Sequence, residues 1–186
     1  SFRKANSYDI DRLIGSANMF DILPNSAFKT SPSISPELKQ AKRDSRLLFK
    51  RVPSSIERDS ILGALGRIGV ATLKHKIRDR VSFVDQAIGD KLPDLTLVTD
   101  QAVNCRNYYV HGGHATFRYV DNFEMVTFFT DALEFVFAAS DLIESGWDVD
   151  GWLKRGHSFH HPFNGFVYGY AINLSSLKTI LESHSK

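Results

Sequence analysis

Three polar residues in the stretch "CRNYYVHGGH" (105–114) are of types that can act on a phosphate ester. Arg106 can hold a phosphate through paired hydrogen bonds, and His111 can accept a proton near neutral pH. Asn107 precedes His111 by four residues, so the two share a helix face, while Arg106 lies one position aside. The set predicts cleavage of a phosphodiester without a metal ion, with Asn107 orienting the imidazole or the phosphate.

A purely structural explanation of the same residues is also open. A cation near the C-terminus of a helix stabilises it by roughly 0.3–1 kcal/mol without any function. The same spacing also occurs at Arg155 and His160, within "RGHSFHHP", a stretch typical of a loop. Context favours the first match, because Arg106 and His111 close a long amphipathic helix.

The elements that must position these residues are predicted to be helices. Apolar residues recur at spacings of three and four in nearly every segment, whereas period-two alternation is scarce, so the fold class is all-α. A very apolar helix over 124–145 is expected to be the central core helix or an oligomer contact. The other helices are expected near 10–20, from Pro36 past Leu48, from a capping box at Ser54 and Glu57 to Gly66, over 73–88, from Pro93 to the Gly112–Gly113 pair, near 147–155 and near 174–182.

The remaining segments are predicted to be irregular. Residues 22–36 are rich in serine and proline and are typical of a long loop, and residues 156–165 form another. Residues 114–123 fit either a short strand or an irregular connection.

Length and composition restrict the class of protein. With 186 residues, 42% of them hydrophobic, one domain spanning 1–186 is expected. The 23 basic and 21 acidic residues give a net charge of +2, too small for a global field that attracts nucleic acid. The single cysteine, Cys105, suits a reducing cytoplasm, and no apolar run approaches a membrane span. The chain starts at Ser1, so we expect a piece of a longer protein, with an N-terminal sensor domain as one candidate partner.

The motif "RNYYVHGG" at the end of a core helix, followed by "FEMVTFFTDALEFVFAASDLIES", resembles the HEPN domains. More specifically, it is similar to the ApeA-like C-terminal HEPN domain of prokaryotic defence proteins, and the layout matches from Ile10 to Glu182. The resemblance implies a helical bundle that acts as a metal-independent endoribonuclease in anti-phage defence or toxin action, with RNA as substrate. It assigns the catalytic roles to Arg106, Asn107 and His111, requires no cofactor, and places the site across a two-fold homodimer.

The chain departs from one branch of this family. Some HEPN toxins carry a tyrosine two residues after the motif histidine, which a partner nucleotidyltransferase modifies. This chain has Gly113 at that position, so the resemblance does not extend to that regulation.

Three other hypotheses stay open at the level of sequence. The domain could be a non-catalytic module that binds RNA, nucleotide or a protein trigger through the same helix end. His157, His160 and His161 could hold zinc or nickel, although no acidic residue or cysteine in their loop completes a common ligand set. A basic face of the helix over 73–88 could follow a nucleic acid backbone, although charge runs are more often solvated surface. That face comprises Lys74, Lys76, Arg78 and Arg80, and the hypothesis adds Arg43, Arg46, Lys50 and Arg51 from earlier in the chain.

Overall fold

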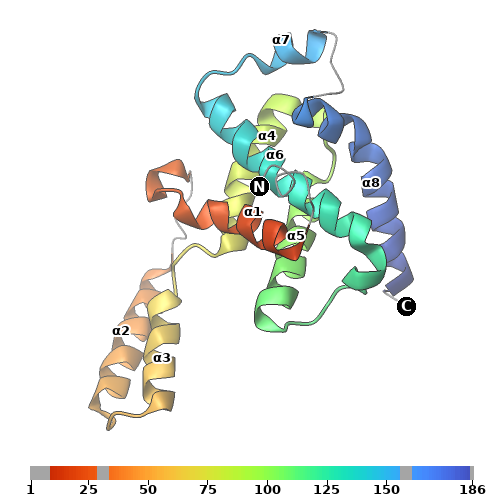
Figure 1. The fold of residues 1–186 in the computed structure, drawn as a ribbon. Coiled ribbons are helices and arrows are strands. Elements are labelled where there is room, and N and C mark those ends of the chain that lie inside the picture. Colours follow the sequence, from red (N-terminus) through yellow and green to blue (C-terminus); the bar gives the residue numbers. More distant parts are fainter. Residues whose placement is uncertain (1–8, 29–33, 156–160, 185–186) are drawn as a thin grey trace, which may run out of the picture. The chain divides into compact units, whose positions relative to one another are not determined.

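The structure, a computed structural model, describes residues 9–28, 34–155 and 161–184. Within these ranges it contains eight α-helices, three short 3-10 helices and no strand, so the all-α prediction is confirmed (Figure 1). The α-helices are α1 (Ile10–Ile22), α2 (Pro36–Arg51), α3 (Ile56–Arg67), α4 (Leu73–Ile88), α5 (Leu95–His111), α6 (Phe123–Glu144), α7 (Val149–Lys154) and α8 (Pro162–His184). The 3-10 helices are η2 (Asn25–Ala27), η3 (Gly89–Lys91) and η4 (Tyr119–Asn122).

The helices fall into two compact units. One unit comprises residues 1–28 and 73–186, and therefore holds α1 and α4 to α8; the other comprises residues 29–72 and holds α2 and α3. The expected single domain over 1–186 stays a prediction. The motif residues all belong to the larger unit.

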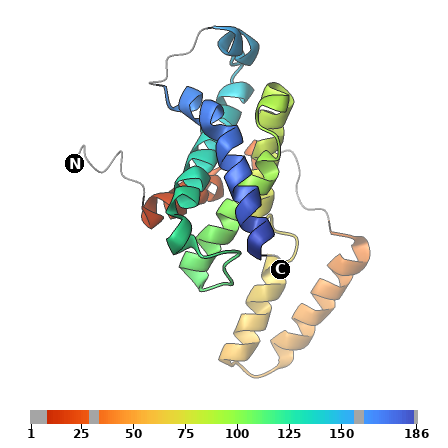
Figure 2. The ribbon, with the colours of Figure 1, turned by 90° about the vertical axis from the view of Figure 1, so that its right-hand side faces the viewer.

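Helix α6 is the centre of the larger unit. It packs against α1, α4, α5 and α8, and the views of Figures 1 and 2 show these helices around it. Half of its residues are buried, among them Met125, Phe129, Ala132 and Val136. Neighbouring helices thus cover the wide apolar surface predicted for this segment on several sides, as expected of a central core helix.

Helix α5 carries the motif and is fixed at both ends. Near its start, the hydroxyl of Tyr170 in α8 donates to the carbonyl oxygen of Pro93 over 2.7 Å. At its end, Gly112 has φ +66°, a left-handed conformation that glycine adopts without a Cβ penalty, and its N–H donates to the carbonyl oxygen of Tyr108. The predicted glycine stop after His111 is confirmed.

Arg80 was predicted to lie on the basic face of α4, and this is wrong, because its side chain is buried with 1% exposure. Its Nε donates to the hydroxyl of Ser140 over 2.9 Å, and its Nη1 donates to the carbonyl oxygen of Ala27 over 3.0 Å and to the carboxylate of Glu144. A buried charge is tolerated only when it is paired and hydrogen-bonded, and these contacts meet both conditions. Arg80 therefore joins α4 to α6 and is not free to bind a nucleic acid.

The other three cations of α4 also have acidic partners. Lys74 and Arg78 both pair with Asp100 of α5, and Lys76 pairs with Asp21 of α1 over 3.0 Å. These pairs tie α4 to its neighbours and neutralise much of the charge that the sequence places on this helix.

The smaller unit is a helical hairpin with little apolar burial. Neither α2 nor α3 has a buried residue, and both begin at a serine cap. Ser55, not Ser54, caps α3: the Ser55 hydroxyl accepts from the N–H of Arg58, so the capping box predicted at Ser54 and Glu57 was displaced by one residue. In α2, the Nζ of Lys42 donates to the carbonyl oxygens of Gly66 and Ile68 at the end of α3.

The structure decides between the two alternatives for one connection and shortens another. Residues 114–123 form an irregular loop that ends in η4, so the strand alternative was wrong. The last helix was expected near 174–182 but begins at Pro162 and runs to His184, because Phe163, Phe166 and Tyr170 extend its apolar face toward the N-terminus. Proline in the first turn of a helix loses no hydrogen bond, so Pro162 starts the helix instead of prolonging the loop.

Candidate active site at the end of helix α5

The structure brings the three predicted site residues into contact. The Nη1 of Arg106 lies 3.1 Å from the Nε2 of His111 and donates to the Oδ1 of Asn107 over 3.1 Å. All three occupy the last turns of α5, where the exposed carbonyl oxygens of a helix end carry partial negative charge. The arrangement is a continuous polar cluster and not three separate surface side chains.

His111 is exposed, as the catalytic interpretation requires, whereas Arg106 is half-buried. The Nε of Arg106 is buried, and it makes no hydrogen bond in the part of the chain that is described. The guanidinium is therefore held with its inner nitrogen enclosed and its Nη1 directed at the imidazole.

The contact between Arg106 and His111 determines the proton on the imidazole. A guanidinium donates hydrogen bonds and accepts none, so the Nε2 of His111 must be the acceptor. This assignment from the hydrogen-bond partners puts the lone pair on Nε2 and a ring proton on Nδ1. A neutral imidazole with a lone pair on Nε2 is the form that can act as a base.

Asn18 is a member of the cluster that the sequence analysis missed. The Oδ1 of Asn18, in α1, accepts from the Nη2 of Arg106 over 2.9 Å. The two residues are 88 positions apart, so no local spacing could have linked them. Asn18 and Asn107 together occupy both terminal nitrogens of the guanidinium and fix its plane.

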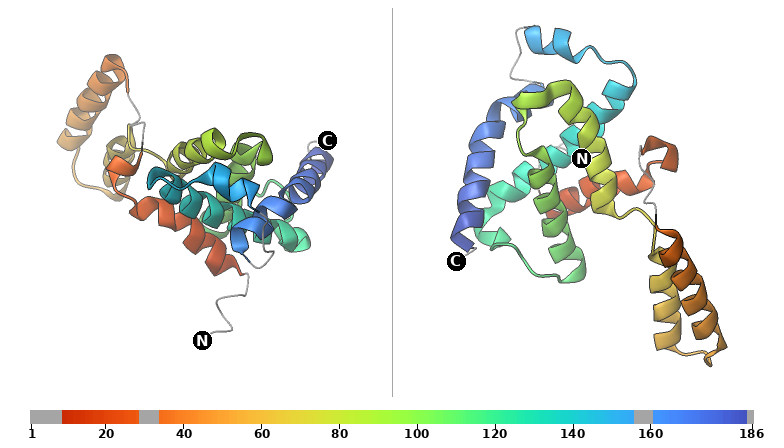
Figure 3. Two further views of the ribbon diagram at one scale, coloured as in Figure 1. Left: turned by 90° about the horizontal axis from the view of Figure 1, so that it is seen from above. Right: turned by 180° about the vertical axis from the view of Figure 1, so that it is seen from behind.

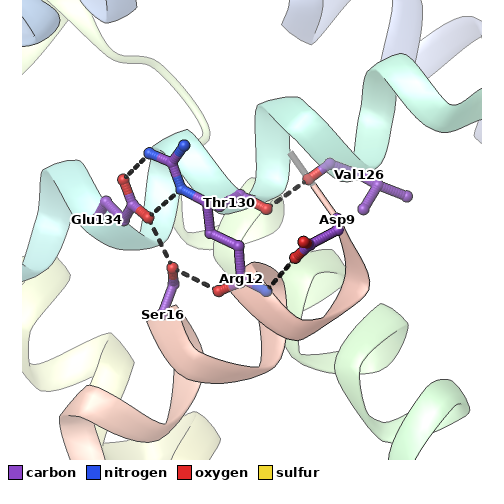
Figure 4. Close-up of polar contacts among 6 residues, drawn as sticks. All are labelled: Asp9, Arg12, Ser16, Val126, Thr130 and Glu134. Atoms are coloured by element: carbon purple, nitrogen blue, oxygen red, sulfur yellow. Dashed lines mark hydrogen bonds and ion pairs between the residues drawn. The ribbon is translucent and has the colours of Figure 1, made fainter. Parts of the chain in front are cut away.

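A second polar cluster holds α1 in place (Figure 4). The Nε and Nη2 of Arg12 donate to the two carboxylate oxygens of Glu134 in α6 over 2.8 and 2.7 Å, and the hydroxyl of Ser16 donates to the same carboxylate over 2.9 Å. Burial alone raises the pKa of Glu134, but the hydrogen bonds from Arg12 and Ser16 and the charge of Arg12 outweigh it and leave the pKa lowered. This bidentate pair positions α1, the helix that carries Asn18.

A pocket of about 460 Å³ lies beside the motif. Asn104, Asn107 and Tyr108 of α5 line one side, and residues 113–116 of the following loop line the other. Asn107 therefore belongs to both features: its Oδ1 accepts a hydrogen bond from Arg106, and its side chain lines this pocket.

Cys105, directly before Arg106, is an unreactive cysteine. It is fully buried, and desolvation raises the pKa of its thiol to about 12. Since the thiolate is the reactive form of cysteine, Cys105 is a core residue and not a nucleophile.

The competing candidate sites lie mostly outside the described residues and stay hypotheses. Of the three histidines proposed as metal ligands, His157 and His160 lie outside the described residues, and the exposed His161 accepts from the N–H of Phe163 through its Nδ1. Among the described residues, no three histidine, cysteine, aspartate or glutamate side chains form a group that could hold a metal ion. The alternative match at Arg155 and His160 cannot be placed either, because His160 is not described.

Comparison with known families identifies the class of protein. The model of the Apea-like HEPN family matches residues 14–150, which span Asn18 and the whole of α4, α5 and α6. The chain belongs to this family. No curated protein and no solved structure matches. Among the described helices, none is long and apolar enough to cross a membrane.

Proposed function

We propose that this domain is a metal-independent RNA endonuclease, with a role in prokaryotic anti-phage defence or toxin action. The observation that carries the proposal is the contact of Arg106 with His111 at the exposed end of α5. Membership of the HEPN family, whose domains are often ribonucleases, supports it.

In the proposed reaction, the Nε2 of His111 removes the proton of a ribose 2′-hydroxyl, and the 2′-oxygen attacks the adjacent phosphorus. Arg106 stabilises the negative charge that grows on the phosphoryl oxygens. The bond to the 5′-oxygen breaks, and that oxygen takes a proton from a second acid, for which the protonated form of His111 in a second copy is a candidate. The products are a 2′,3′-cyclic phosphate and a 5′-hydroxyl, and DNA is not cut because it lacks the attacking group.

The resting geometry adds one step to this reaction. The lone pair on the Nε2 of His111 accepts from Arg106 before substrate binds, so it is not yet available to a 2′-hydroxyl. An incoming phosphate offers Arg106 a charged acceptor, which binds a guanidinium more strongly than a neutral imidazole does. Transfer of the Nη1 hydrogen bond from His111 to the phosphate would free the base when the substrate arrives.

The same contact also suits the second candidate function. If the hydrogen bond between Arg106 and His111 persists with RNA bound, the imidazole cannot accept a proton, and the cluster serves only as a binding site. The domain would then be a module that recognises RNA, nucleotide or a protein trigger.

The two functions are separated by the products that purified protein forms. Single-stranded RNA, labelled at its 5′ end, is incubated with the protein in excess EDTA, and the ends of any fragments are analysed. The nuclease predicts 2′,3′-cyclic phosphates and 5′-hydroxyls, no cleavage of DNA, and no effect of the chelator. RNA that stays intact while it binds the protein would support the module, and cleavage abolished by EDTA would support a metal-dependent site.

A further inference from the structure

The pocket beside the motif contains polar groups that the described part of the protein does not satisfy. Asn104 is half-buried, yet its amide makes no hydrogen bond with any described residue. Asn107 uses its Oδ1 on Arg106, which leaves its amide N–H groups without an acceptor among the described residues. The amide atoms of both residues remain open to solvent, so water can satisfy them in the free protein, and a ligand with matching donors and acceptors can replace that water.

The lining of the pocket lies on the same helix face as the proposed base. Asn104, Asn107 or Tyr108, and His111 follow one another at helical spacings of three and four, so they form one stripe along α5. Asn107 touches both Arg106 and the pocket. A ligand in the pocket would therefore be next to whatever Arg106 and His111 hold.

The opposite wall is held in place by the core. Tyr119 is 2% exposed, and its hydroxyl lies 3.1 Å from the Oγ1 of Thr116 and 3.4 Å from the backbone nitrogen of Thr116. The ring of Tyr108 packs against the ring of Tyr119 with a centroid distance of 5.4 Å. The buried tyrosine thus fixes both the loop and the aromatic side chain, and the pocket exists before any ligand binds.

We propose that this pocket holds one unstacked nucleobase of the RNA substrate, adjacent to the cleaved phosphate, and that Asn104 determines the base preference. This inference rests on the proposed function. The volume of about 460 Å³ is within the range of roughly 300–1,000 Å³ that small-molecule pockets occupy. An asparagine amide offers a donor next to an acceptor, which matches the edge of a base, and Tyr108 offers a π-surface. The substrate is therefore single-stranded where it is cut, because a paired base cannot enter.

A second pocket, lined by charged side chains that already bind each other, is a poorer candidate. The pocket bordered by Arg12 and Glu134 has about 620 Å³, but these two side chains bind each other with two short hydrogen bonds. A ligand there would have to break an ion pair, whereas a base at Asn104 breaks no contact of the described residues.

Two pocket variants and one matched control test the inference. Asn104→Ala removes the amide, and Ala115→Trp places a large ring at an exposed position on the rim, where it obstructs the pocket without removing a core contact. Asn173→Ala makes the same change at a half-buried asparagine in α8 that does not line this pocket. Circular dichroism and thermal unfolding verify that each variant is folded.

The measurements are the base frequencies beside the cut in RNA of random sequence, and the affinity for 2′-O-methyl RNA of random sequence, which cannot be cleaved by attack of a 2′-hydroxyl. We expect Asn104→Ala to weaken binding roughly tenfold, about the loss of one or two hydrogen bonds, and to flatten the base frequencies. Ala115→Trp should weaken binding by a similar factor, and Asn173→Ala should behave as the wild type.

The failure of this inference can be told apart from failure of the nuclease. If the wild type cuts RNA and both pocket variants keep its affinity and base frequencies, the pocket does not bind a base, although the nuclease stands. If the wild type never cuts but binds RNA with an affinity that depends on Asn104, the nuclease is wrong and the pocket stands. If it neither cuts nor binds RNA, both are wrong.

Discussion

The guanidinium of Arg106 contacts Asn18, Asn107 and His111 at once. These contacts involve both terminal nitrogens of one planar group. A lysine ammonium would keep the charge, but it could not present two nitrogens in one plane to partners on two helices. At the scale of single residues, the proposed chemistry therefore depends on geometry as much as on residue type.

Replacing His111 by alanine should slow RNA cleavage by about 10²–10⁴-fold, the usual contribution of a positioned acid or base. Because His111 is exposed, the domain should stay folded. Arg106→Lys should also be impaired, through loss of the paired hydrogen bonds. Rates are measured under single-turnover conditions, with the double variant Arg155→Ala, His160→Ala as control for the alternative motif. A control as damaging as His111→Ala would show that the wrong motif was chosen.

Asn18→Ala should lower the cleavage rate without removing any group that reacts. Loss of the 2.9 Å contact frees one side of the Arg106 guanidinium, and misplaced catalytic groups cost up to about 10²-fold in rate. A positioning role predicts that kcat falls while KM changes little, and that Asn18→Asp, which keeps the acceptor oxygen, retains more activity than alanine. Equal rates for wild type and Asn18→Ala would contradict this role.

At the scale of elements, the site depends on how α5 ends and how α1 is held. Gly112 turns the chain through a left-handed conformation directly after His111, and the bidentate pair of Arg12 and Glu134 joins α1 to α6. In Figure 3, the loop that follows α5 leads back to α6, so the end of the motif helix and the central helix are directly connected.

Gly112→Ala should destabilise the domain by roughly 1–2 kcal/mol, because a Cβ is strained at φ +66° although no atom lies near enough to clash. Gly15→Ala is the opposite test. Gly15 lies inside α1 with open space around its Cα, so alanine there should stabilise by roughly 0.5–1 kcal/mol. Urea unfolding measures both free energies. The same sign for the two variants would contradict the conformational assignment.

Glu134→Gln should destabilise the domain at pH 7 by about 1 kcal/mol, a modest value because the pair is partly exposed. The folded-state pKa of Glu134 lies below its usual value of 4.5, so its carboxylate contributes stability above pH 4.5, and this contribution is lost as the pH falls through the folded-state pKa. The difference between wild type and variant, measured by urea unfolding, should therefore shrink in acid. Asp121→Asn, in an exposed pair with Arg118, is the control and should change stability little at any pH.

At the scale of the whole molecule, the proposed site is incomplete in one chain. One histidine can take the proton of the 2′-hydroxyl, but a second acid is needed for the leaving oxygen, and a second copy of the exposed His111 would supply it. HEPN domains commonly act as dimers on RNA, which agrees with this requirement.

The protein should therefore sediment as a dimer at micromolar concentration, and its specific activity should fall on dilution below the dissociation constant. Mixing wild-type protein with an excess of His111→Ala protein gives a further check: mixed dimers hold one His111 instead of two, so the activity of the wild-type chains should be lost as they exchange into mixed dimers. A monomer with full activity at every concentration would exclude the composite site.

The sequence by itself determined the all-α class, the boundaries of α4, α5 and α6, and the motif residues Arg106, Asn107 and His111. These features depend on interactions between residues a few positions apart: apolar stripes at helical spacing, glycine after the last turn, and side chains in neighbouring turns. Because local conformation depends on residues that are neighbours in the sequence, these features could be predicted without knowledge of the fold. Two helix starts were missed. Ser54 and Ser55 are both plausible caps of α3, so the sequence did not distinguish them. Pro162 fits a loop as well as the first turn of α8, so the start of that helix was placed too late.

Only the tertiary structure decided which polar groups have partners. Asn18 meets Arg106 across 88 residues, Arg12 meets Glu134 across 122, and Arg80 is buried against Ser140 instead of lying on an exposed basic face. Likewise, the amide of Asn104, which makes no hydrogen bond with a described residue, is recognised as part of a pocket only once the loop over 113–116 is seen to face it. The physical reason is that the free energy of a polar side chain depends on its desolvation and its partners, and packing brings those partners from helices distant in the chain.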